Sequence, residues 1–198
     1  AGQKALRDHA HEVLAAGVDL LVLSVGALAD PELAAALTTD GPGRLFYTSG
    51  AIGGLDLLAA ARRQAPLTHV RLTTTKKPAT IAQPWMDQAT LQRLRTTTDA
   101  FDVYRGTARD VPIKFPKSTN VAAALALATG NWDLEVIVRA DPAAPMTRHT
   151  IDAEGPYGQY RFEICNAPDE ANPATSKIVP HAVLRTIATL AHAGGQVL

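Results

Sequence analysis

The chain has 198 residues, 46% hydrophobic and 19% charged, which is enough for a substantial core in one large domain or two small ones. Nineteen basic residues balance nineteen acidic residues without a long block of like charge, so the composition argues against nucleic acid and favours a small-molecule ligand. The apolar runs are too short to span a bilayer, no signal-peptide pattern opens the chain, and the single cysteine excludes an intrachain disulfide or a CxxC metal site. We therefore expect a cytoplasmic protein without a metal.

Helices and strands alternate over residues 1–75. The near-continuous apolar run at 18–25 is typical of a parallel strand that is buried on both faces. The order β-α-β-α-β with short loops predicts a parallel sheet with right-handed crossovers. The expected helices are Lys4–Ala16, one from the Asp30 N-cap to Leu37, and Gly54–Gln64, and the expected strands are Val18–Val25, Arg44–Thr48 and Thr68–Thr75.

Two turns that follow the first two strands are rich in small residues, SVGALAD at 24–30 and TSGAIGGLD at 48–56. In open α/β sheets ligands lie beyond the carboxyl ends of the strands, where small residues let a cofactor approach the backbone. Ala27 and Gly50 are therefore candidate cofactor contacts, although the glycines can equally serve the turns alone. Because the chain opens inside a helix and has no GxGxxG loop, we expect the first half of a doubly wound nucleotide fold to be absent from it.

The pattern changes after the TTTKKP turn. The elements expected next are a helix at 84–97, a strand at 103–107, a connector at 111–112 and an alanine-rich helix that ends near Gly130. Ser118 or Thr119 is a plausible N-cap of that last helix, and Asn120 falls in its first turn. An asparagine there can direct its amide toward a ligand at the positive end of the helix, or it can simply help to cap the helix.

Three closely spaced strands follow and predict an antiparallel meander, Leu134–Ala140, Met146–Ala153 and Tyr157–Asn166. Alternation along the middle strand places His149 on a face with apolar residues and Arg148 on the opposite face. A half-buried histidine there can serve as a general acid or base, or it can be a satisfied core residue. Cys165 is expected to be buried in the third strand, and a final amphipathic helix is expected at 179–193.

Several of these segments, in this order, resemble the L-aspartate dehydrogenase family. They are TSGAIGGLD, the run from RGTARD to FPKSTNVAAALALA, RADP followed by RHTIDAEGPYG, and NAPDEANPATSK. The resemblance extends over residues 20–190, and it departs from the family at Thr147 and Ser118, where members often have asparagine.

The fold class that the resemblance implies is α/β. Residues 1–75 are expected to be the C-terminal part of a Rossmann-like, parallel-sheet, NAD-binding domain. Residues 76–170 are expected to form an α/β catalytic and dimerisation domain with a mixed, largely antiparallel sheet. Residues 171–198 are expected to supply a helix that packs back on both.

The function implied by the resemblance is oxidation of L-aspartate to iminoaspartate, which hydrolyses to oxaloacetate and ammonia, with NAD or NADP as hydride acceptor. Such an enzyme is expected to be a homodimer and to feed NAD biosynthesis. Carried over by motif, Ala51 and Asn120 match positions that contact the cofactor, and His149 matches the active-site histidine.

Cationic partners are needed for the two carboxylates of aspartate. The nearest candidates are Lys76, Lys77 and Arg148. Two alternatives remain open: a related dehydrogenase for another amino or hydroxy acid, and a truncated paralogue that acts only as a structural, dimerising module.

Overall fold

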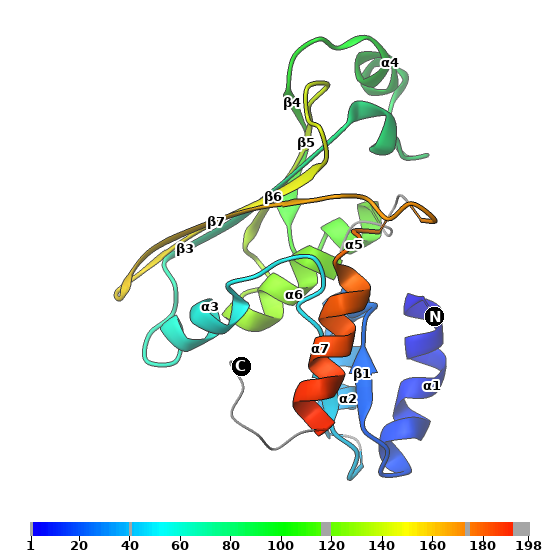
Figure 1. The fold of residues 1–198 in the computed structure, drawn as a ribbon, viewed down its shortest axis with the longest axis vertical. Helices are drawn as coiled ribbons and strands as arrows, with labels where there is room; N and C mark the ends of the chain where they lie inside the picture. Colours follow the sequence, from blue (N-terminus) through cyan, green and yellow to red (C-terminus); the bar gives the residue numbers. More distant parts are fainter. Residues whose placement is uncertain (1, 40, 116–119, 173–174, 192–198) are drawn as a thin grey trace.

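In the computed structural model the described residues are 2–39, 41–115, 120–172 and 175–191, and they form two sheets with helices between and beside them (Figure 1). The helices and 3-10 turns are α1 Gln3–Ala15, η1 Val25–Ala29, α2 Pro31–Thr39, α3 Leu55–Ala61, η2 Pro78–Thr80, α4 Gln88–Thr96, α5 Val111–Lys114, α6 Asn120–Thr129 and α7 Val179–Ala191. The strands are β1 Leu20–Val22, β2 Leu45–Tyr47, β3 His69–Lys76, β4 Phe101–Thr107, β5 Glu135–Ala140, β6 Thr147–Gly155 and β7 Gly158–Asn166.

The first sheet is the parallel pair β1–β2, in which Leu21 lies opposite Phe46. The helix α1 buries Leu14 against a core that includes Val25 and Leu28. The predicted strand Val18–Val25 is longer than β1, because Val25 and Leu28 bury their side chains from the 3-10 turn η1 rather than from an extended strand. The predicted parallel sheet, with helices between its strands, is confirmed for the first two strands.

The second sheet has the strand order β4-β5-β3-β6-β7, with β3 parallel to β5 and antiparallel to β6. The expectation that β3 continues the first parallel sheet is therefore wrong. From Val70 to Thr74 its buried residues alternate with half-buried ones, a pattern typical of a strand with one open face. The expected three-strand meander is confirmed only for the β6–β7 hairpin, since β3 separates β5 from β6. The domain divisions at residues 75 and 170 remain predictions.

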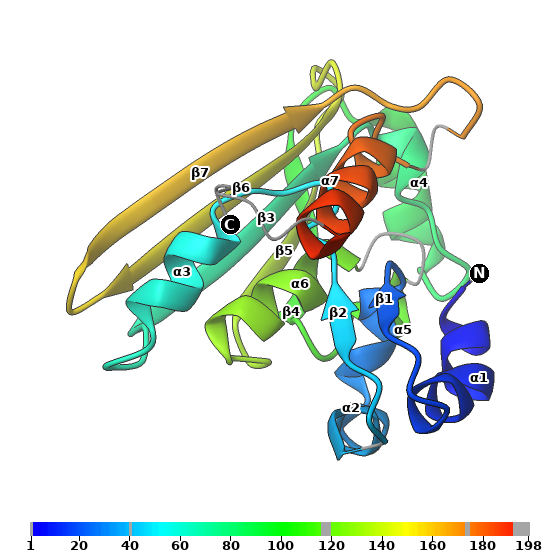
Figure 2. The same ribbon diagram turned by 60° about the horizontal axis from the view of Figure 1, so that its bottom comes forward.

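The helices α3 and α6 cover one face of the second sheet (Figure 2). The alanines of α6 let its backbone approach the sheet closely, and Ala122 and Leu125 are buried in one apolar core with Leu72 and Val136. Within the described part of the chain, no helix lies over the other face of this sheet, which carries charged and hydroxyl side chains.

Other local expectations are corrected by the structure. Cys165 is exposed, because β7 is an edge strand and Cys165 is on its open face, while Ile164 packs toward the core. The connector at 111–112 is the start of the short helix α5. The helix expected at 84–97 begins later, where the Asp87 side chain accepts a hydrogen bond from the Thr90 N–H and caps α4.

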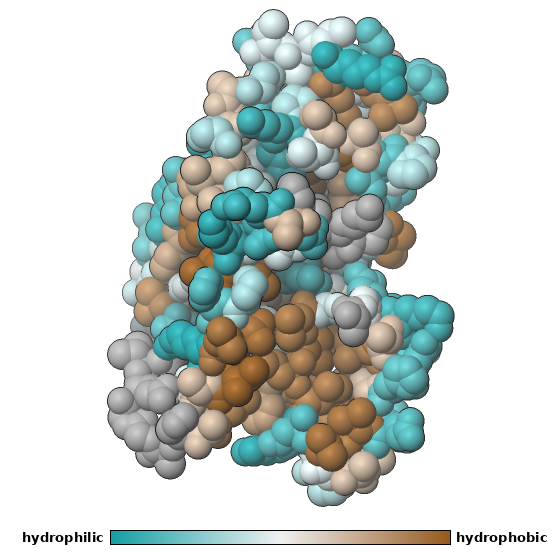
Figure 3. All heavy atoms as spheres, turned by 45° about the vertical axis from the view of Figure 1, so that its right-hand side comes forward, coloured by the Kyte–Doolittle hydropathy of each residue, from teal (hydrophilic) through white to brown (hydrophobic). Residues whose placement is uncertain are grey.

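The C-terminal helix α7 buries none of its residues. Leu184 is 62% exposed and Ile187 is 50% exposed, although α7 is amphipathic. Figure 3 shows apolar side chains gathered over the lower half of the molecule, where Figure 1 places α7 and the first sheet. Among the helices that the structure describes, none is long and apolar enough to cross a membrane.

Candidate active site

The turns after β1 and β2 lie at the same edge of the first sheet, because the two strands are parallel. In the second turn Gly54 has a φ of 77°, and a Cβ built on it would lie 2.5 Å from the Phe162 ring. The fold itself therefore requires glycine at 54. Gly50 also has a positive φ, of 63°, which favours glycine for conformational reasons.

Gly53 is different. It lacks the left-handed φ of its neighbours, and a Cβ placed on it would meet nothing within 4 Å. No contact within the described chain therefore requires glycine at 53. A Cβ on Gly50 would likewise meet nothing within 4 Å, so the backbone of the turn at 50–53 is open at the strand end.

Two asparagine side chains connect these turns to the second sheet and its helix. Asn120, the first residue of α6, accepts a hydrogen bond at Oδ1 from the Gly26 N–H at 3.0 Å. Asn166, the last residue of β7, donates from Nδ2 to the Ala51 carbonyl oxygen at 2.7 Å. Because Oδ1 of Asn120 is engaged, its Nδ2 provides the donors for a bound group. Asn166 was not predicted as a site residue, although it opens the motif NAPDEANPATSK.

The helix-covered face of the second sheet becomes polar toward the end of its strands that lies near these turns. Register partners across β3, β6 and β7 form the row Thr74–His149–Ile164. Two residues further along each strand, at this end of the sheet, lie Lys76, Thr147 and Asn166. In the opposite direction the row is Leu72–Ile151–Phe162, which is apolar. His149 therefore stands at the boundary between the core and the polar edge.

His149 is 4% exposed, and its Nδ1 lies 3.0 Å from Oγ1 of Thr74. Burial, together with the positive charge of Lys76, lowers the pKa of His149 from 6.5 to about 4. Burial likewise lowers the pKa of Lys76. The imidazole is thus neutral at physiological pH and can accept a proton at one ring nitrogen.

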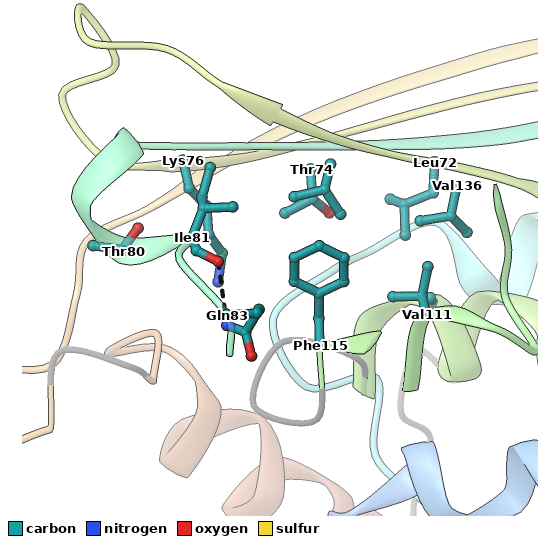
Figure 4. A pocket seen from close by; sticks show the side chains of 11 residues that line it. Leu72, Thr74, Lys76, Thr80, Ile81, Gln83, Val111, Phe115 and Val136 are labelled. Carbon is teal, nitrogen blue, oxygen red and sulfur yellow. Dashed lines mark hydrogen bonds between the residues drawn. The ribbon is translucent and has the colours of Figure 1, made fainter. Parts of the chain in front are cut away.

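A small pocket opens beside Thr74 and Lys76 (Figure 4). Thr74 and Lys76 reach into it from the sheet, and Phe115 and Val111 face them from α5 and its C-cap. Its cavity volume of about 20 Å³ accommodates about one water molecule. The amide of Gln83 also lines it but donates to the Ile81 and Ala82 carbonyls.

Three of the predicted site residues lie apart from this group. Arg148 is on the opposite face of the sheet, with its guanidinium 3.9 Å from a carboxylate oxygen of Asp141. Lys77 is exposed beyond the end of β3. Ala27 is 0% exposed within the η1 turn and presents no surface to a ligand in this structure. Gly50, Ala51 and Asn120 belong to the connected turns, and Lys76 shares a pocket with Thr74 beside His149.

Family models match the two parts of the chain separately. Residues 1–41 match the homoserine dehydrogenase NAD-binding domain, and residues 56–190 match the C-terminal domain of aspartate dehydrogenase. Together with the strand-end turns and the neutral histidine, these matches define the class of protein as a dehydrogenase that uses a nicotinamide dinucleotide.

Curated relatives narrow the class. The chain is 39% identical to L-aspartate dehydrogenase 2 of Bordetella pertussis, over 94% of this chain and 70% of that protein. It is 40% identical to L-aspartate dehydrogenase of Ralstonia nicotianae, over 98% of this chain and 72% of that protein. The chain belongs to the L-aspartate dehydrogenase family and is an oxidoreductase that acts on CH–NH₂ donors.

A solved structure agrees with this assignment. The crystal structure of aspartate dehydrogenase from Thermotoga maritima superposes with a TM-score of 0.80 at 25% identity, and covers 100% of this chain and 76% of that one. The predicted α/β fold class and the predicted family are therefore confirmed.

Proposed function

We propose that this chain oxidises L-aspartate to iminoaspartate with NAD or NADP, and that water then converts iminoaspartate to oxaloacetate and ammonia. A hydride leaves the α-carbon and a proton leaves the amino nitrogen. The observation that carries the proposal is the buried, neutral His149, which lies beside Lys76 on a sheet that Asn166 connects to the glycine-rich turn.

The residues that fit the cofactor are Gly50, Ala51 and Gly53 of the turn, together with the Asn120 amide. When bound, the nicotinamide supplies the carbon that accepts the hydride. The two asparagine hydrogen bonds hold the turns against the second sheet, so they set the distance between the cofactor site and the histidine.

Lys76 is the residue that we assign to a substrate carboxylate. The pocket volume of about 20 Å³ is too small for aspartate, so the substrate lies at the polar edge above it, in reach of Lys76 and Thr147. Arg148 is not part of this proposal, since it lies on the other face of the sheet. Lys77 lies beyond the end of β3 and remains a candidate for contact with the substrate from outside the pocket.

His149 is proposed to take the proton from the amino group or from the attacking water. In the absence of substrate its basicity is low, because it is buried and because Lys76 is positively charged. Of the two substrate carboxylates, one neutralises the field of Lys76 and the other adds negative charge, and both effects raise the pKa of His149. His149 thus becomes a better base when aspartate is bound.

A substrate panel tests the proposed function. L-Aspartate is expected to give the highest kcat/KM among L-aspartate, L-glutamate, L-alanine and L-malate, with reduction of NAD and of NADP followed by absorbance. A preference for L-malate would assign the chain to hydroxy-acid oxidation. Absence of turnover together with absence of NADH binding in a calorimetric titration would favour the structural, dimerising module.

Asn166→Asp is expected to weaken NADH binding by roughly tenfold, because a carboxylate cannot donate to the Ala51 carbonyl and repels it. A fluorescence titration with NADH measures this affinity. Asn131→Asp is the matched control, because the Oδ1 of Asn131 accepts from the Asp133 N–H in a loop, and a carboxylate keeps that acceptor. Equal affinity in Asn166→Asp and the control would show that the turn is held by other contacts.

We also propose that the chain forms a homodimer through the open face of the second sheet. This face combines both signs of charge, in Arg71, Arg105, Arg139, Arg148, Arg161, Asp102, Glu135, Asp152 and Glu163. Positive and negative groups alternate across it in ion pairs, for example Arg161 with Asp152 and Arg71 with Glu135. A face that carries both signs of charge can pair with a second copy of itself under a two-fold rotation, as an isologous interface requires.

Charge reversal at Arg161 tests the homodimer. Arg161→Glu would replace the partner of Asp152 with a third acidic side chain beside Asp152 and Glu163. We expect it to shift sedimentation toward the monomer at concentrations where the wild type is dimeric. Arg63→Glu, at an exposed position after α3, is the control. A dimer of unchanged stability in Arg161→Glu would exclude this face as the interface.

A further inference from the structure

Thr74 and His149 face each other across the antiparallel β3–β6 pair. Both side chains are buried, Thr74 at 5% exposure and His149 at 4%. The hydroxyl oxygen lies 3.0 Å from Nδ1, within hydrogen-bond distance. The two residues are 75 positions apart in the sequence, and the sheet register alone brings them together.

A neutral imidazole carries one proton, and the partner of one ring nitrogen decides where that proton is held. If the Thr74 oxygen accepts, the proton is on Nδ1 and the lone pair of Nε2 is available as a base. When Nε2 has taken up a proton, both ring nitrogens carry hydrogen, and Nδ1–H still requires an acceptor. The Thr74 hydroxyl can accept in both states, because it has two lone pairs.

We propose that Thr74 is a positioning residue for proton transfer: its Oγ1 accepts from Nδ1–H of His149, directs Nε2 toward the substrate and stabilises the imidazolium. This inference rests on the proposed function, since it assumes that His149 moves the proton. It adds a role for a residue of β3 that no motif indicates.

The groups around Thr74 and His149 explain why the Thr74 hydroxyl matters to the imidazole. Lys76 on β3 is the charged group whose field reaches His149, and the register partner on β7 is the apolar Ile164. From the helices, Ala122 of α6 and Phe115 at the end of α5 line the pocket on the Thr74 side. Among the described residues no carboxylate forms a hydrogen bond with the imidazole, so a neutral oxygen takes the position that an acid occupies in a catalytic triad.

Thr74→Val removes the acceptor while it keeps the β-branched shape, so the strand and the pocket wall are retained. We expect kcat to fall by roughly 10- to 100-fold, the size of effect found when the outer hydrogen-bond partner of a metal-ligating histidine is lost. The KM for NAD is expected to stay unchanged, and Thr74→Ser is expected to restore turnover. Thr129→Val is the matched control, because it removes another buried threonine hydroxyl, which donates to the Leu125 carbonyl within α6 and belongs to neither the proposed site nor the proposed interface.

Nitrogen NMR of the imidazole gives a readout that does not depend on activity. The His149 signals, identified by their loss in His149→Gln, are expected to report the Nδ1-protonated tautomer in the wild type and a shift toward the Nε2-protonated tautomer in Thr74→Val. The acid limb of the kcat/KM profile is expected to move to lower pH in Thr74→Val, because the imidazolium has lost its acceptor.

The outcomes separate this inference from the proposed function. An Nε2-protonated tautomer in the wild type, or unchanged turnover of Thr74→Val while His149→Gln is inactive, overturns the role of Thr74 and leaves the proposed function intact. Unchanged turnover of His149→Gln overturns the assignment of proton transfer to His149, and with it the role of Thr74, whatever tautomer NMR reports.

Discussion

His149→Gln is expected to lower kcat for L-aspartate by roughly 10²- to 10⁴-fold, the contribution of a positioned general acid or base. Glutamine has a similar length and can still hydrogen-bond to Thr74, so the packing around the site is retained. It cannot take up a proton at neutral pH. The loss should therefore appear in kcat, and the KM for NAD should stay close to that of the wild type, because the proposed cofactor residues belong to the strand-end turns and to α6 rather than to β6.

His181→Gln is the matched control for this experiment. His181 is exposed on α7 and has no role in the proposed site. Its turnover is expected to equal that of the wild type. A near-normal kcat in His149→Gln would remove His149 from the mechanism, and the neutral, buried imidazole would then be a core residue satisfied by Thr74.

The stability of the protein is expected to fall by roughly 2 kcal/mol between about pH 7.5 and pH 5 because of His149 alone. Its pKa is about 4 in the folded protein against an ordinary value of 6.5. The unfolded chain therefore binds a proton below about pH 6.5, whereas the folded protein does not bind it until about pH 4. Protons favour the unfolded state throughout this window, so stability decreases as the pH decreases.

Denaturant unfolding at several pH values measures this effect. The curve for His149→Gln should be flatter than that of the wild type between about pH 6.5 and pH 5. Arginine hydrogen bonds lower the pKa values of Asp102 and Glu135, so those carboxylates lose their stabilising charge only at lower pH, outside the diagnostic window. Parallel curves for the wild type and His149→Gln would show that the folded imidazole titrates normally.

The sequence indicated much of the local structure correctly. The apolar run and the small-residue turn identified β1, β2 and the strand-end loop, because these patterns reflect local backbone requirements and burial. Alternation placed His149 on the covered face and Arg148 on the open face, although Arg148 was still considered for the substrate. The same reasoning failed for Cys165, since alternation does not reveal that one face of an edge strand lacks a cover.

The sequence by itself determined the family, the alternation of elements and the face of the strand that carries His149, because motifs and periodicity are encoded in neighbouring residues. Only the tertiary structure decided that β3 lies between β5 and β6, which brings Thr74 and Lys76 beside the histidine. It also decided that Asn166 holds the Ala51 carbonyl across 115 positions of chain. Strand order and register depend on how distant segments pack together, and no local pattern specifies which distant segment a strand will contact.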